Sequence, residues 1–344
     1  MTTSPTPTPK PRGRWLQFSL RTLMVLMLVF GCGFGWLGME LRQARRQREA
    51  VQAIEKLGGE VEFDYEQYDP SRYVTVPPTP PVPPGPAWLR RLVGEDFFVN
   101  ATTVLILSSQ VADAKLVHLQ ALPQLRCLDL GSSEVTDAGL VHLRGLRTLR
   151  YLSLDSTQVT DAGLERLRQL TKLEWLSLSN TQVTDAGLER LRGLTQLQSI
   201  CLGNTRVTDA GLQHLQGLTK LQELVLHSTQ VTDNGLKHFR ELTHLQFLSL
   251  DNTRVTDAGL VHLRNLTYLD NLGLSNTEVT DAGLVYLLTQ FRRLSLCETQ
   301  VTDAGLVHLR QLRQLEELDL RKTEVTKTGV AELQKALPNC EIER

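Results

Sequence analysis

The sequence predicts an α/β solenoid with a parallel sheet on its concave face and helices on its convex face. The hexapeptide VTDAGL, once written VTDNGL, begins at Val135, Val159, Val183, Val207, Val231, Val255, Val279 and Val301. Successive copies are 24 residues apart, except for one step of 22 residues between Asp281 and Asp303. Units of this length stack into a solenoid because no single unit can bury its own apolar face.

The apolar positions of each unit assign a strand and a helix. Leu152 and Leu154 alternate with polar residues, so we expect a short strand that pairs in parallel with the equivalent strand of the next unit. Leu140 and Leu143 have helical spacing and are expected to face the sheet. An inward threonine, such as Thr157, can satisfy turn backbone that would otherwise be buried without a partner.

The hexapeptide itself is interpreted as the start of a helix. Thr136 is then the N-cap, and Val135 and Leu140 form a hydrophobic staple. Asp137 lies in the first turn, where the helix dipole favours a negative charge. Asp137 could instead be the cap, with Thr136 one position outside the helix. The hexapeptide therefore indicates architecture and not catalysis.

The complete unit resembles a leucine-rich repeat. Its pattern is LxxLxLxxTxVTDAGLxxL, with threonine where asparagine or cysteine is usual, from about residue 100 to the C-terminus. It is similar to the cysteine-containing subclass, known from substrate-recognition subunits of F-box ubiquitin ligases, but no F-box-like segment precedes the repeats. The segments FSLRTL, AIEKLGGEVEFDYE and PAWLRRLVGEDFF add a similarity to bacterial membrane-anchored leucine-rich-repeat proteins, which implies a scaffold.

We expect five segments along the chain. Residues 22–39 hold eighteen residues without a charge between basic clusters, which predicts a single-pass transmembrane helix whose orientation is undetermined. A cleaved signal peptide and a lipoprotein anchor are the alternatives. Gly31 and Gly35 could support weak self-association of this helix. The other segments are a basic, disordered tail (1–21), a juxtamembrane helix and short strand (40–69), a proline-rich loop or spacer (70–86), and a repeat domain with an N-terminal capping segment and about ten repeats (87–344).

Charge and composition argue against several functions. Residues 1–58 carry nine basic and three acidic residues, so the remainder of this chain of formal charge −1 carries −7, which disfavours nucleic-acid binding. The five cysteines form no CxxC pair, so neither a disulfide framework nor a zinc site is expected. The sequence holds no phosphate-binding loop, nucleophile elbow or HExxH motif. We therefore expect no enzyme activity and no cofactor.

Two repeated columns raise the question of metal binding. One aspartate per unit offers too few oxygens for calcium, which needs six to eight. The histidine column lies five residues after each aspartate, on the flank of the helix, and has no carboxylate partner. We expect solvated surface at both columns and no metal site. The histidines are His118, His142, His214, His238, His262 and His308.

The concave face is the expected ligand surface of such a solenoid. Its candidate protein-binding residues are Tyr151, Trp175, Phe247, Glu223 and Arg293, because exposed aromatic side chains are enriched at protein interfaces. The sequence thus predicts a membrane-tethered scaffold or receptor-like module for an unidentified protein ligand. Near-identical repeats also permit a structural spacer or surface coat without a specific ligand, and ubiquitin-ligase-type substrate recognition follows from the family analogy alone.

Overall fold

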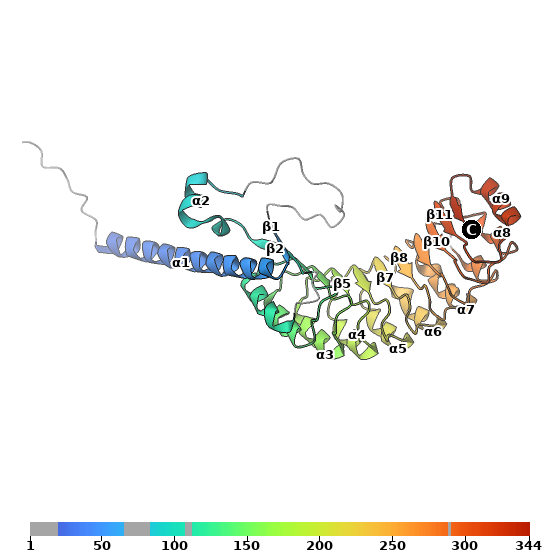
Figure 1. Cartoon of the computed structure of the whole chain (residues 1–344), viewed down its shortest axis with the longest axis horizontal. Coiled ribbons are helices and arrows are strands. Elements are labelled where there is room, and N and C mark those ends of the chain that lie inside the picture. The colour runs from blue at the N-terminus through green and yellow to red at the C-terminus, as the bar shows by residue number, and fades with distance from the viewer. Residues whose placement is uncertain (1–19, 65–82, 107–111, 288–289) are drawn as a thin grey trace, which may run out of the picture.

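The chain folds into a curved solenoid. The computed structural model describes residues 20–64, 83–106, 112–287 and 290–344. In these residues the strands line the inner side of an arc and the helical turns line its outer side (Figure 1). One twelve-stranded sheet runs in chain order from β1 to β12. Strand β1 pairs with β2 in antiparallel fashion, and each later pair is parallel, which confirms the predicted α/β solenoid.

Each repeat contributes one short strand to this sheet. The strands are β1 (Glu60–Phe63), β2 (Ala101–Leu105), β3 (Cys127–Asp129), β4 (Tyr151–Ser153), β5 (Trp175–Ser177), β6 (Ser199–Cys201), β7 (Glu223–Val225), β8 (Phe247–Ser249), β9 (Asn271–Gly273), β10 (Arg293–Ser295), β11 (Glu317–Asp319) and β12 (Glu341–Glu343). Neighbouring strands are in a register that places equivalent residues of consecutive units opposite each other, for example Leu152 opposite Leu176.

The helical side of the repeats is built from short α-helical and 3-10 turns. The α-helices are α1 (Leu20–Lys56), α2 (Ala87–Val93), α3 (Asp161–Leu164), α4 (Asp185–Leu191), α5 (Asp209–Leu212), α6 (Asp233–Leu236), α7 (Asp257–Leu260), α8 (Leu306–Leu309) and α9 (Lys327–Ala336). The 3-10 turns are η1 (Glu95–Phe97), η2 (Asp113–Ala121), η3 (Gly139–Gly145), η4 (Glu165–Gln169), η5 (Gln213–Leu215), η6 (Lys237–Glu241), η7 (Val261–Asn265) and η8 (Gly283–Tyr286).

A continuous leucine core fills the space between strands and turns. In a typical unit all seven apolar positions are fully buried: Val159, Leu164, Leu167, Leu170, Leu173, Leu176 and Leu178. The inward threonine closes the turn after the strand, since the Thr157 hydroxyl donates to the Leu154 carbonyl at 2.6 Å. The predicted satisfaction of buried backbone by this threonine column is thus confirmed.

The hexapeptide also connects consecutive repeats. In the units with an α-helical turn from α3 to α7, the threonine is the N-cap of its own turn: the Thr184 hydroxyl accepts a hydrogen bond from the Ala186 N–H at 3.3 Å. Each aspartate reaches into the next unit, where the Asp185 carboxylate accepts from the Thr208 backbone N–H at 2.8 Å and from its hydroxyl at 2.6 Å. We call this repeated contact the Asp–Thr ladder. Threonine is therefore the cap of the turn, and aspartate connects its own unit to the next one.

The ladder continues along the whole stack of repeats. It joins Asp113 to Thr136, Asp137 to Thr160, Asp161 to Thr184, Asp185 to Thr208, Asp209 to Thr232, Asp233 to Thr256, Asp257 to Thr280, Asp281 to Thr302 and Asp303 to Thr326. At its last step, hydrogen bonds from Thr326 hold the pKa of the Asp303 carboxyl below its ordinary value. Because the folded-state pKa of Asp303 is depressed, this carboxylate stabilises the fold at pH values above its unfolded-state pKa. That stabilisation is lost as the pH falls through the folded-state pKa.

Replacing Thr184 with alanine is expected to lower the free energy of unfolding by about 1–3 kcal/mol, because the variant loses the N-cap hydroxyl and the hydrogen bond that this hydroxyl donates to the Asp161 carboxylate. The urea midpoint followed by circular dichroism measures the change. Thr184→Ser keeps a hydroxyl and should retain most of the stability. An unchanged midpoint in Thr184→Ala would contradict both roles assigned to this hydroxyl.

Helix α1 closes the N-terminal end of the repeat stack. Its C-terminal half packs against the first units through Ala50 and Ile54, which are buried. The Gln47 side-chain amide, itself buried, donates to the Val99 carbonyl at 2.9 Å. The Gln43 amide donates to the Ala121 carbonyl at the same distance, 2.9 Å. This half of α1 therefore supplies the cap that a terminal repeat needs in order to cover its apolar side.

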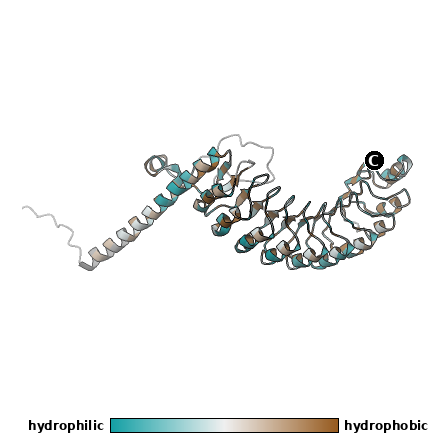
Figure 2. Cartoon of the chain, turned by 60° about the horizontal axis from the view of Figure 1, so that its bottom comes forward, coloured by the Kyte–Doolittle hydropathy of each residue, from teal (hydrophilic) through white to brown (hydrophobic). Residues whose placement is uncertain are grey.

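The predicted transmembrane helix at 22–39 is wrong. In the part of the chain that the structure describes, no helix is both long enough and apolar enough to cross a membrane. The segment lies within α1, and the helix becomes charged after Met39. Figure 2 shows this change as pale to brown colours at the free end of α1 and teal nearer the repeats. The prediction of a single-pass membrane protein is contradicted by the same finding.

Other predictions about the N-terminal region remain open. In the described chain nothing lies within 4 Å of a Cβ added at Gly31 or Gly35. No contact within that part of the chain therefore occupies this surface, and self-association through these glycines stays a prediction. The expected short strand after α1 is present as β1. Residues 1–19 of the predicted tail and residues 70–82 of the predicted proline-rich segment lie outside the described residues.

Candidate protein-binding face

Strand geometry decides which side chains reach the concave face. The middle residue of each three-residue strand points into the core, as Leu152 and Leu176 do. The first and third residues of the strand point to the concave side. The residue two positions after the third strand residue does so as well. We call these three positions the concave columns. The five candidate residues Tyr151, Trp175, Glu223, Phe247 and Arg293 all occupy the first column, on β4, β5, β7, β8 and β10.

Two of these candidates are in direct contact. The Tyr151 and Trp175 rings stack with their centroids 4.0 Å apart and their planes 6° from parallel. Both side chains are half-buried, because the parallel register holds them side by side over the sheet. A stacked pair contributes roughly 0.5–1.5 kcal/mol beyond its buried area. We call this unit the aromatic pair, and it presents a rigid apolar surface on a face whose other side chains are mostly polar.

The next two positions in the first column are polar. Ser199 lies opposite Trp175 on the neighbouring strand and is buried. Its hydroxyl donates to the Glu223 carboxylate at 2.7 Å, and Glu223 follows Ser199 in the register. A short side chain thus separates the Trp175 ring from the Glu223 carboxylate.

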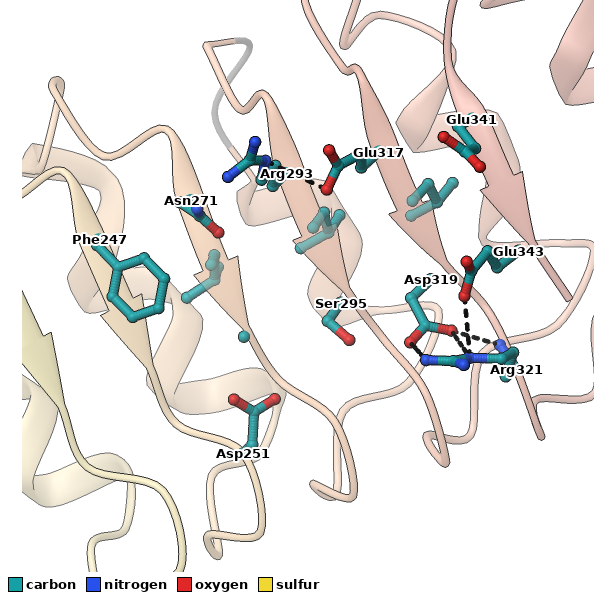
Figure 3. Close-up of a pocket in the computed structure, with 14 residues that line it drawn as sticks. Phe247, Asp251, Asn271, Arg293, Ser295, Glu317, Asp319, Arg321, Glu341 and Glu343 are labelled. Carbon is teal, nitrogen blue, oxygen red and sulfur yellow. Dashed lines mark hydrogen bonds and ion pairs between the residues drawn. The ribbon is translucent and has the colours of Figure 1, made fainter. Parts of the chain in front are cut away.

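The remaining two candidates border an open hollow of about 400 Å³ toward the C-terminal end of the face. Figure 3 shows Phe247 and Asp251 on one side of this C-terminal hollow, and Arg293 and Arg321 with their acidic neighbours on the other side. Residues at its base include Gly273, where an added Cβ would come within 2.3 Å of the Asp251 carboxylate.

Both arginines of the hollow are engaged within the protein. Arg293 Nε lies 3.2 Å from the Glu317 carboxylate. Arg321 donates to Asp319 through Nε and a terminal nitrogen at 2.9 and 2.7 Å, and its Nε lies 3.2 Å from Glu343. The hydrogen bond from Arg321 holds the pKa of the Asp319 carboxyl below its ordinary value.

Sequence reasoning missed Asp251, although a signal for it exists. The inward and outward alternation continues past each strand, so the residue after the buried Leu250 also faces the concave side. The Asp251 carboxylate accepts from the Ser249 hydroxyl and the Ser275 N–H, both at 2.7 Å. Applying the alternation to one more residue per unit would have placed Asp251 on the face.

A second half-buried aspartate stands in the same column near the aromatic pair. Asp155 accepts from the Ser177 hydroxyl and, at 2.9 Å, from the Ser179 N–H. Burial raises the pKa of the Asp155 carboxyl, and the nearby Asp129 raises it further. Burial also raises the pKa of the neighbouring Cys201 thiol to about 12, with a smaller contribution from Glu223. The Cys201 thiol is therefore a poor nucleophile at neutral pH.

The histidine and aspartate columns have other partners. His142 and His238 lie 3.1 and 2.6 Å from the amide nitrogens of Gln120 and Gln216, and the aspartates form the Asp–Thr ladder. Burial lowers the pKa of the His214 imidazole. In the part of the chain with described coordinates, no group of three or more His, Cys, Asp or Glu side chains is arranged to hold a metal ion.

Comparisons with known proteins agree with this architecture. Leucine-rich-repeat models match residues 121–143, 145–167 and 171–214. The matched residues lie within the stack of repeats, so this part of the chain is similar to leucine-rich repeats in sequence as well as in fold. The models are general ones, so the cysteine-containing subclass stays a prediction. No curated protein sequence matches the chain.

Solved bacterial structures share the fold. An internalin (inlF) from Listeria monocytogenes is 22% identical with a TM-score of 0.55, over 66% of this chain and 69% of its own. A leucine-rich-repeat protein from Leptospira interrogans is 22% identical with a TM-score of 0.52, over 66% of this chain and 62% of its own. Leucine-rich-repeat domains generally mediate protein–protein interaction and are typically binding modules without enzyme activity.

Proposed function

We propose that this chain is a binding scaffold that holds a protein partner on its concave face, with the aromatic pair Tyr151 and Trp175 as the anchor. The observation that carries the proposal is the stack itself, a rigid apolar surface that remains half-exposed where small polar residues would suffice. Such aromatic anchors dominate the binding energy of many protein interfaces. Glu223, Phe247 and Arg293 extend the same column and would contact the partner beside the anchor.

The pattern of variation between repeats supports a ligand and not a simple spacer. The VTDAGL hexapeptide is nearly constant because it carries the caps and the ladder. The first concave column instead runs through aromatic, small, acidic, amide and basic residues from Tyr151 to Glu317. A surface coat would need only the constant positions.

Replacing the pair, as Tyr151→Ser with Trp175→Ser, is expected to reduce capture of specific partners by at least about tenfold, because a central aromatic anchor contributes about 2 kcal/mol or more. The measurement is affinity capture from the cells that produce the chain, quantified by mass spectrometry. Thermal unfolding verifies that the variant folds.

Tyr268→Ser is the matched control. Tyr268 is 63% exposed and precedes β9, outside the concave columns. Proteins lost with the double variant and retained with Tyr268→Ser would be ligands of the concave face. Identical capture by all three proteins would contradict the proposal and favour the spacer or coat.

A further inference from the structure

We propose that the partner contributes a basic, extended segment, with one arginine side chain stacked on Trp175 above Ser199 and paired with Glu223. This inference rests on the proposed function and names the chemistry of the partner. The starting observation is the charge of the concave columns. From β3 to β12 they carry eight carboxylates and two guanidinium groups, a formal charge of −6, whereas the whole chain carries −1. The acidic residues are Asp129, Asp155, Glu223, Asp251, Glu317, Asp319, Glu341 and Glu343.

The internal cations leave much of this charge unpaired. Arg293 and Arg321 are engaged by Glu317, Asp319 and Glu343. Among the described residues, Glu223 and Asp251 accept hydrogen bonds only from neutral groups, the hydroxyls of Ser199 and Ser249 and the Ser275 N–H. A basic partner would supply the missing counter-charges, and complementary charge both speeds encounter and selects the partner.

The register provides a fitting position for a guanidinium group. The Tyr151 ring covers one face of the Trp175 ring. The other face is directed toward Ser199 on the neighbouring strand, and this short side chain does not cover it as a second ring would. Glu223 lies two strands from Trp175, a separation of roughly 10 Å at the usual strand spacing. A planar guanidinium can stack on the indole and donate to the carboxylate, which a compact ammonium does less well.

A second basic side chain fits the C-terminal hollow. Phe247 offers a ring and Asp251 a carboxylate, beside the small residues Gly273 and Ser295. The distance from Ser199 on β6 to Asn271 on β9 is three strand spacings, or roughly 14 Å. An extended chain covers that distance in about four residues. The two basic side chains are therefore expected about four positions apart in a segment that crosses the strands.

Fluorescence anisotropy with labelled peptides tests this inference on the full chain. The probe is a glycine–serine peptide of about sixteen residues with arginine at every fourth position, and the comparison peptides carry glutamine or glutamate there. We expect the arginine peptide to bind at least about tenfold more tightly than the glutamine peptide and to weaken with added salt. Glu223→Gln and Asp251→Asn should each weaken binding by about fivefold or more.

Glu189→Gln is the matched control, because Glu189 is exposed on α4, on the convex side, and should leave binding unchanged. Equal affinity for the arginine and glutamine peptides, or an effect of Glu189→Gln as large as that of Glu223→Gln, would overturn the inference. If the aromatic pair still governs protein capture in that case, the proposed function stands and only the basic partner is rejected. Capture that is insensitive to the aromatic pair would reject both.

Discussion

Asp185→Ala is expected to lower the free energy of unfolding by about 2–4 kcal/mol. The Asp185 carboxylate accepts two hydrogen bonds from Thr208 of the next repeat, at 2.8 and 2.6 Å. A hydrogen bond to a charged group contributes about 1.5–3 kcal/mol, and partial exposure reduces the sum. The Thr208 N–H also loses its partner. The measurement is the urea unfolding midpoint of the full chain.

The matched control for this variant is Glu189→Ala. Glu189 is an exposed carboxylate on the same helix, so its loss should change the free energy of unfolding by less than about 0.5 kcal/mol. If Asp185→Ala and Glu189→Ala had equal midpoints, the Asp–Thr ladder would carry no stability, and the repeated aspartate would need another explanation.

Gly211→Ala is expected to destabilise the chain by about 1–3 kcal/mol, although alanine is the better helix former. A Cβ at Gly211 would lie 2.3 Å from the Asp185 Oδ1 atom, which is fixed by Thr208 and cannot move aside without breaking its hydrogen bonds. Gly193→Ala is the control, because nothing lies within 4 Å of its Cβ position. We expect that variant to be neutral or slightly stabilising.

The two substitutions should be strongly coupled. Removing the Asp185 side chain clears the space beside Gly211, since the next nearest group, a Leu188 methyl, lies at 3.1 Å. In the Asp185→Ala background, Gly211→Ala should therefore cost at least about 1 kcal/mol less than in the wild type. Additive effects in this double-mutant cycle would show that the glycine does not make room for the aspartate of the preceding repeat.

The repeat architecture was predictable because its determinants are local and periodic. Val159 and Leu164 recur at fixed intervals, and burying them together requires one stacking arrangement. The partner of Asp137 was not predictable, because it lies 23 residues away in the next unit and a helix dipole explains the residue equally well in isolation. The transmembrane prediction rested on a count of uncharged residues, and among the described residues no helix is long and apolar enough to span a membrane.

The candidate site was predictable in its location but not in its contacts. Strand alternation placed Tyr151 and Trp175 on the concave face, and the parallel register then stacked their rings. The pairing of Arg293 with Glu317 depends on rotamers that no sequence pattern specifies. Asp251 was overlooked because it lies beyond the three residues of its strand.

The Asp–Thr ladder also bears on how such a chain changes length. Each unit from Thr136 to Asp303 carries both halves of the contact, a threonine for the unit before it and an aspartate for the unit after it. Insertion or removal of a whole unit therefore leaves each junction chemically complete. The 22-residue step from Asp281 to Asp303, across which Asp281 still bonds Thr302, shows that the spacing between hexapeptides can vary as well. Lys327, at the aspartate position of the unit after Asp303, lacks the carboxylate that would continue the series. The number of repeats, and with it the reach of the concave face, can thus evolve without redesign of the interior.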